Sequence, residues 1–244
     1  MLFLRCLFLF TLCSYAQAGV SYNKFLQVKK AIHLTFEELR PHPSQKLYIN
    51  RITQGLSESY WWDVSMVHAS YVRSESNEFI EHNIYLMGGL ARMEGISPEG
   101  LLLIGCHELG HGLGGEPRKK GSLSSTEGQA DYFATQICLP IALKHLNSKT
   151  PFKTKSSYSS ICLRQTDYEM SLCQRMVFAL ESEIAIFKST GETADLTKSS
   201  QEVVDELNLS SNFYPKAQCR LDTMINGILG LRRPQCWYPG GELL

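Results

Sequence analysis

The chain has 244 residues, with 24 basic and 24 acidic side chains and a formal net charge of zero. A balanced charge gives no general attraction to nucleic acid or to an anionic membrane surface, so we expect neither as a partner. The length suits a single domain with a sizeable hydrophobic core, which we expect over residues 19–244.

Residues 1–18 have the features of a secretory signal peptide. Arg5 is the only early charge, an apolar run follows it, and Ala16-Gln17-Ala18 has the small-x-small form of a cleavage site. The alternative is an N-terminal membrane anchor, but the run is short for a span of about 20 residues. We therefore expect a periplasmic or secreted protein with no stable membrane span after cleavage.

Six cysteines remain beyond residue 18, and an even number in an exported chain favours disulfide bonds. We expect at least two such bonds, although the sequence does not choose among the possible pairings. Cys106 could alternatively be a simple core residue, because it shares one helix face with Leu102, Leu109 and Leu113. The six are Cys106, Cys138, Cys162, Cys173, Cys219 and Cys236.

The first half of the chain predicts one helix and a strand pair. Residues 25–39 space their apolar side chains as an amphipathic helix does. Residues 60–73 and 77–87 are rich in aromatic and β-branched side chains, which favours two strands. We expect these strands to form an antiparallel hairpin that ends at Gly88-Gly89.

The rest of the chain is mostly helical in pattern. Ser97 and Pro98 indicate the start of a helix that stops at Gly114-Gly115. Further helices are expected from near Ser124 to Pro140, over residues 168–187 and from near Pro215. The basic run 118–120 is expected to be a solvated loop. The fold class is therefore predicted as α+β, mostly helical, with a small antiparallel sheet packed by the helix over residues 98–113 and the one after it.

Two histidines on the helix that starts at Pro98 predict a metal site. His107 and His111 are four residues apart, so both imidazoles lie on one face and can bind one ion. Glu108 follows the first histidine, where a carboxylate can act as a base toward water activated by zinc. This H-E-x-x-H motif predicts one Zn²⁺ per chain.

A catalytic zinc usually has three protein ligands, so a third must come from elsewhere. The metzincin pattern would place a histidine where this chain has Pro117, which cannot bind metal. Glu116 is poorly placed beside the turn. Glu127 and Asp131 share one face of the next helix, so Glu127 could complete the site while Asp131 fixes a histidine tautomer. The alternative for Glu127 is a capping box with Ser124.

H-E-x-x-H followed by E-x-x-x-D on the next helix resembles the gluzincin class of zinc metallopeptidases. The segment "EGQADYFA" is similar to the E-x-x-A-D motif of the HtpX and CAAX-protease-like families. Upstream, "NIYLMGG" resembles their edge strand and glycine pair. Downstream, "YPKAQCR" resembles their His-Pro-x-x-x-x-Arg segment, with Tyr214 in place of the histidine. The likeness covers roughly residues 83–222 and is strongest over 105–134.

The resemblance implies an exported zinc metalloendopeptidase that acts on a peptide or protein substrate. His107, His111 and Glu127 would bind zinc, and Glu108 would act as general base. Tyr214 or Arg220 would stabilise the oxyanion, although Arg220 could equally form a structural ion pair. Substrate would pair with the strand residues Asn83, Ile84, Tyr85 and Leu86.

The sequence is compatible with two other functions. One is a zinc-dependent hydrolase of a non-peptide envelope substrate. The other is a non-catalytic envelope protein that a metal stabilises, against which Glu108 argues, because a structural site gains nothing from an unligated base.

Overall fold

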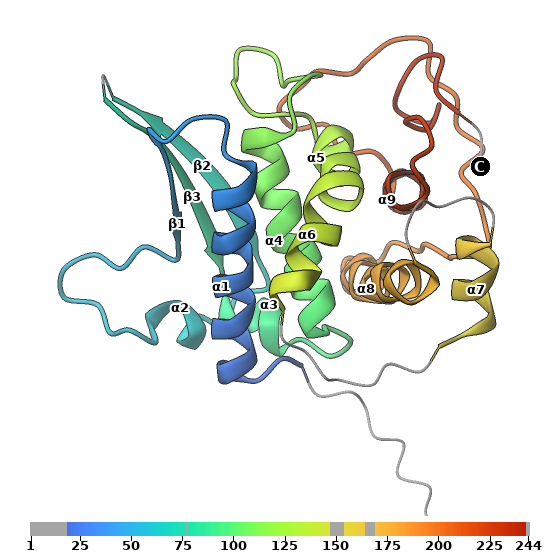
Figure 1. Cartoon of the computed structure of the whole chain (residues 1–244). Helices are drawn as coiled ribbons and strands as arrows, with labels where there is room; N and C mark the ends of the chain where they lie inside the picture. Colours follow the sequence, from blue (N-terminus) through green and yellow to red (C-terminus); the bar gives the residue numbers. More distant parts are fainter. Residues whose placement is uncertain (1–18, 77, 147–153, 164–168, 243–244) are drawn as a thin grey trace, which may run out of the picture.

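The computed structural model describes residues 19–76, 78–146, 154–163 and 169–242, so the predicted signal peptide lies outside the described residues. A small sheet lies on one side of the molecule, and a body of helices occupies the rest (Figure 1). The α+β class is confirmed. The elements are α1 Tyr22–Leu39, β1 Gln45–Ile49, α2 Tyr60–Asp63, β2 Ala69–Glu75, β3 Ile80–Leu86, α3 Gly88–Arg92, α4 Pro98–Leu113, α5 Glu127–Phe133, the π-helical turn Ala134–Cys138, α6 Leu139–His145, α7 Ser156–Cys162, α8 Met170–Ser189 and α9 Ala217–Leu229.

The sheet is mixed and has the strand order β1-β3-β2. The predicted antiparallel pairing is present between β2 and β3, where Tyr71 lies opposite Ile84. β1 was not expected, and it pairs in parallel with the other side of β3, with Ile49 opposite Ile84. β3 is therefore the central strand, and β2 lies at an edge of the sheet.

The predicted first strand is too long at its start. Residues 60–63 form the short helix α2, and the strand begins only at Ala69. The aromatic side chains there serve packing, since the ring of Trp62 lies 5.3 Å from the rings of Tyr22 and Phe25 on α1. High β-propensity describes a side chain that fits a half-buried surface, and here a helical turn supplies that surface.

Helix α4 is the centre of the fold and begins as predicted. Pro98 is at its first turn, and the Ser97 hydroxyl accepts a hydrogen bond from the Gly100 amide. Its residues 98–111 are all buried, as expected for a helix that packs on every side. The sheet and α1 lie on one side of it, and α5, α8 and α9 lie on the other (Figure 1).

Three disulfide bonds join all six cysteines beyond residue 18, which confirms the expectation of at least two. The pairs are Cys106–Cys138, Cys162–Cys173 and Cys219–Cys236. Cys106 is fully buried and also bonded, so its core position and its disulfide are compatible. Disulfides persist in oxidising compartments, and three of them are consistent with a protein outside the cytoplasm.

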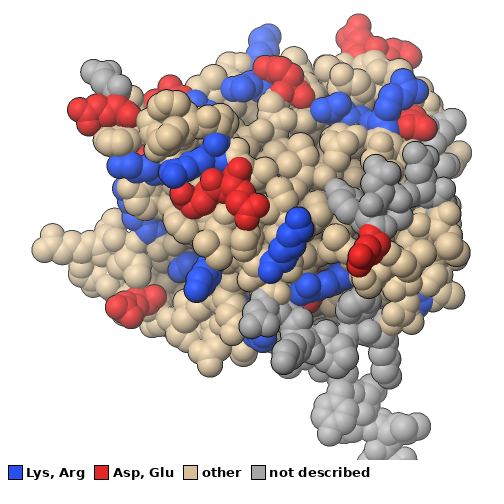
Figure 2. Space-filling view, in the orientation of Figure 1, with Lys and Arg blue, Asp and Glu red and all other residues tan. Residues whose placement is uncertain are grey.

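The surface carries mixed charge. Acidic and basic side chains are interspersed on the face that Figure 2 shows, in keeping with the zero net charge of the chain. Among the described helices, none combines the length and the apolar composition that a bilayer crossing requires.

Candidate metal centre

The imidazole rings of the two α4 histidines lie next to each other. His107 and His111 are both 8% exposed, and their ring centroids are 4.8 Å apart in an edge-on arrangement. Both lie in the buried C-terminal half of α4, one turn apart. The i, i+4 spacing therefore produces the shared face that the sequence predicts.

Helix α5 brings the Glu127 carboxylate next to both imidazole rings. Its carboxylate oxygens lie 3.3 Å from Nε2 of His107 and 3.6 Å from Nε2 of His111. α5 can approach this closely because Gly110 has no side chain: a Cβ there would lie 2.8 Å from the Ala130 backbone. Ligand atoms of the three residues all lie within 4.8 Å of one another, the only such group found among the described residues.

Hydrogen bonds to Nδ1 fix the orientation of both imidazoles. Asp131 Oδ1 lies 2.7 Å from Nδ1 of His107, and the Ser125 carbonyl lies 3.0 Å from Nδ1 of His111. Both partners are acceptors, so each Nδ1 carries a proton, and in the neutral ring the lone pair of Nε2 faces Glu127. This is the tautomer that a metal-binding histidine needs.

Arg220 of α9 holds Asp131 in place. Its Nε and Nη2 atoms each donate a 2.8 Å hydrogen bond to the Asp131 carboxylate, in a bidentate pair. Asp131 itself is completely buried. Of the two roles expected for Arg220, the structure shows the ion pair.

The capping-box alternative for Glu127 is excluded by the helix start. The N-cap residue of α5 is Thr126, and Glu127 is the first helical residue. A capping box needs its glutamate at the third helical position, with Ser124 as the cap. Glu127 instead turns inward, and its oxygen Oε1 accepts a 2.7 Å hydrogen bond from the ammonium group of Lys119.

The pKa values at the centre follow from burial and from neighbouring charge. Burial lowers the pKa of His107, but the carboxylates of Asp131 and Glu127 outweigh that effect and raise it to about 10. Burial, together with the nearby His107, lowers the pKa of His111 to about 4. Burial alone would raise the pKa of Glu127, yet its histidine contacts hold it well below the usual range. The centre thus favours an ionised Glu127 next to a positive charge.

The donor set fits a divalent cation. Two imidazole nitrogens and one carboxylate are ligands that zinc accepts. Their ligand atoms all lie within 4.8 Å of one another, so they can reach a single ion.

Glu108 lies beside the three ligands without joining them. Its side chain is buried and lines a cavity of about 560 Å³, in which His107, His111 and Glu127 also lie. Burial raises the pKa of Glu108 to about 7. At neutral pH this carboxyl group can therefore both accept and release a proton.

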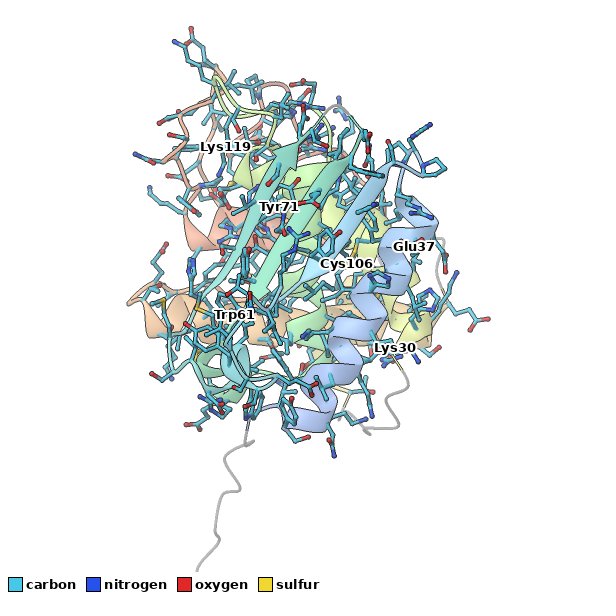
Figure 3. All side chains as sticks on the ribbon, turned by 90° about the vertical axis from the view of Figure 1, so that its left-hand side faces the viewer. Lys30, Glu37, Trp61, Tyr71, Cys106 and Lys119 are labelled. Carbon is cyan, nitrogen blue, oxygen red and sulfur yellow. A yellow bond between two sulfur atoms is a disulfide. The ribbon has the colours of Figure 1, made fainter. Side chains whose placement is uncertain are left out.

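The cavity lies between the sheet edge and α8. Residues 67–71, which include the start of β2, form one wall, and Glu183 and Ile186 of α8 with Thr190 just after it form another. Figure 3 looks onto the sheet and labels Tyr71 on the strands and Lys119 in the loop between α4 and α5; both line the cavity. The edge strand β2 therefore runs along the cavity that contains His107 and His111.

The predicted substrate strand is wrong in its position. Residues 83–86 belong to β3, whose backbone pairs with β1 on one side and β2 on the other. Beyond the end of β1, the Asn50 side chain bonds to both the amide and the carbonyl of Leu86. A peptide therefore cannot pair with this strand, and the edge near the centre is β2.

Tyr214 lies at the mouth of the cavity and is 59% exposed. Burial and the nearby Glu127 raise the pKa of its hydroxyl, so the hydroxyl keeps its proton and can donate a hydrogen bond. The Lys119 ammonium lies 5.9 Å from the Tyr214 ring centroid. The structure thus brings Tyr214 to the cavity but leaves its role a prediction.

Three residues at the centre were not foreseen from sequence: Lys119, Ser125 and Glu183. The basic run 118–120 was expected to be solvated, yet the Lys119 side chain is only 16% exposed. Its position between the two ligand-bearing helices was the one available signal. Ser125 acts through its backbone, and Glu183 comes from a distant helix, so neither has a sequence signature.

Comparisons with family models, with curated proteins and with solved structures find no significant match to this chain.

Proposed function

We propose that the protein is an exported zinc-dependent metallopeptidase. The observation that carries the proposal is a buried His107-His111-Glu127 group with an unligated carboxyl group, Glu108, beside it in one cavity. A purely structural metal site has no use for such a base. The three disulfide bonds support the proposed periplasmic or secreted location.

His107, His111 and Glu127 would hold the zinc ion. Zinc, when bound, supplies Lewis-acid activation of water and polarises a substrate carbonyl. Asp131 and the Ser125 carbonyl keep the two histidines in the binding tautomer. Arg220 acts through Asp131, so it is a positioning residue in this proposal.

Glu108 would transfer a proton from the attacking water to the leaving amine. Its carboxylate accepts a proton from the attacking water and returns it to the nitrogen of the leaving amine. A pKa of about 7, which burial produces, suits both steps at neutral pH. The neighbouring donor for the developing oxyanion would be Tyr214, whose hydroxyl keeps its proton at the mouth of the cavity, whereas Arg220 forms its bidentate pair with Asp131.

The substrate would be an extended peptide bound along β2. This strand pairs with β3 on one side only, and no other described strand covers its second edge. Residues 67–71 line the cavity next to His107 and His111. Backbone pairing at that edge would carry the scissile bond past Glu108.

The test is cleavage of an unbiased peptide library by the zinc-loaded chain beginning at Gly19. We expect cleavage of peptide bonds that a chelator abolishes and that added zinc restores. No cleavage of any peptide at full zinc occupancy would contradict the proposed function.

A further inference from the structure

A carboxylate that the proposed reaction does not use lines the same cavity. Glu183 of α8 is 4% exposed, and among the described residues it has no hydrogen bond or ion pair. Glu181, on the same helix, has both: it bonds to Lys155 and to the Tyr158 hydroxyl. Glu183 is thus a buried acid that faces the cavity without a bonded partner.

Arg220, the charged neighbour of Glu183, already bonds to another carboxylate. Arg220 uses its Nε and Nη2 atoms for Asp131. A buried carboxylate without a bonded partner is costly, and burial accordingly raises the pKa of Glu183. A positively charged group that entered the cavity could donate the hydrogen bond that Glu183 lacks among the described residues.

Apolar side chains line the same cavity as Glu183. Leu90 of α3, Ile104 of α4 and Ile186 of α8 give the cavity an apolar lining. Lysine and arginine side chains combine an apolar stem with a cationic end, and they pack the stem while the end meets a polar partner. Apolar lining residues together with the unbonded Glu183 carboxylate match that combination.

We propose that Glu183 forms a specificity subsite for a cationic group of the substrate, either a lysine or arginine side chain near the scissile bond or a free amino terminus. The inference rests on the proposed peptidase function and names its substrate class. Glu183 would contact the substrate directly.

The experiment compares three matched peptides with the zinc-loaded chain beginning at Gly19. One is acetylated and contains lysine, one is acetylated with norleucine in its place, and one is the norleucine peptide with a free amino terminus. We expect kcat/KM for one cationic peptide to exceed that of the neutral peptide by roughly 10–100-fold, as for a charge-assisted contact. Which cationic peptide is favoured assigns the subsite to a side chain or to the terminus.

The variants test whether Glu183 causes that preference. Glu183→Gln should lower kcat/KM for the cationic peptide to the value for the neutral peptide. Glu183→Asp should retain part of the preference. Glu181→Gln is the matched control on the same helix and should keep the full preference. Thermal unfolding of each variant checks that the fold is intact. A preference that survives Glu183→Gln would overturn the inference.

Binding separates this inference from the proposed function. The same peptides, labelled with a fluorophore, are titrated into the Glu108→Gln protein with and without Glu183→Gln, so that no turnover is needed. Tighter binding of a cationic peptide that depends on Glu183 supports the subsite even if no peptide is cleaved. Cleavage with equal rates and equal binding for all three peptides would overturn the subsite and leave the peptidase function standing.

Discussion

Asp131 connects two buried partners, the Nδ1 atom of His107 and the guanidinium group of Arg220. Its negative charge keeps the Nδ1 proton in place and leaves Nε2 free for a metal. The carboxylate is fully buried, so only the bidentate arginine and the histidine satisfy it. A change at this one residue should therefore act on the metal without removing a ligand.

Asp131→Asn should weaken zinc affinity by roughly 10–100-fold, the usual effect of losing a group that orients a ligand. Competition with a chromogenic chelator measures the affinity. Asp195→Asn is the control, because the Asp195 side chain is 45% exposed and its partners among the described residues are its neighbours Thr197 and Lys198. Equal zinc affinity for Asp131→Asn and wild type would show that Asp131 does not orient His107.

Glu127→Ala should remove most of the bound zinc, because two histidines alone leave the ion without its third protein ligand. It also leaves the Lys119 ammonium without its carboxylate partner near the site, which further disfavours a cation. Metal analysis after dialysis measures the occupancy. Glu116→Ala, at an exposed glutamate of the preceding turn, should retain full zinc. Full occupancy in Glu127→Ala would disprove the assigned ligand set.

At the scale of elements, the centre depends on how α4 and α5 are held together. Gly110 permits close approach of the two helices, and the disulfide Cys106–Cys138 ties α4 to the π-helical turn that follows α5. The bond closes a segment of 32 residues that contains Lys119, Ser125 and Glu127. It therefore restrains the loop that brings these three residues to the histidines.

Replacing both Cys106 and Cys138 by alanine should lower the free energy of unfolding by about 3–4 kcal/mol, from the loop-closure entropy of the unfolded chain. Denaturant titration measures this loss. The control is the double variant Cys162→Ala, Cys173→Ala. It removes a disulfide that closes a shorter segment, of 11 residues, away from the centre. Zinc affinity should fall in the first double variant and stay unchanged in the second. Unchanged zinc affinity in the first double variant, with a loss in the second, would contradict the proposal that Cys106–Cys138 restrains the loop.

How much could be predicted from sequence differs between elements. The two histidines are four residues apart on one helix, so local periodicity suffices to place them together. Glu127 needed the assumption that the next helix packs back on the first; its spacing with Asp131 suggested this, and the resemblance of "EGQADYFA" supported it. The parallel strand β1 has only five residues, and nothing local in it indicates a partner some 35 residues away.

The missed contacts share a physical cause. Ser125 contributes a backbone carbonyl, which any residue carries, so its identity is not informative. Glu183 reaches the cavity through the packing of α8 on α4, which the helical pattern of residues 168–187 cannot specify. The short helix at residues 60–63 has the aromatic composition of a strand, but its Trp62 ring packs on α1.

At the scale of the whole molecule, the six cysteines beyond residue 18 are all paired. Mass spectrometry of alkylated, unreduced protein exported from cells should therefore find no free thiol among them. The same protein alkylated after reduction serves as the control and should show six modified cysteines. More than two free thiols in the exported protein would contradict the expected oxidising compartment.

The chemistry at Glu108 gives the most direct test of a zinc peptidase. Glutamine has nearly the same shape as glutamate but cannot accept the proton, and general-base help is typically worth about 10²–10⁴-fold in rate. Since Glu108 is not among the three ligands, its replacement should leave the metal in place.

The measurement is zinc content and peptide cleavage, side by side, for wild type and Glu108→Gln. We expect equal zinc content, a normal thermal unfolding transition and a loss of nearly all hydrolytic activity in the variant. Cleavage by Glu108→Gln at the wild-type rate would contradict the proposed mechanism.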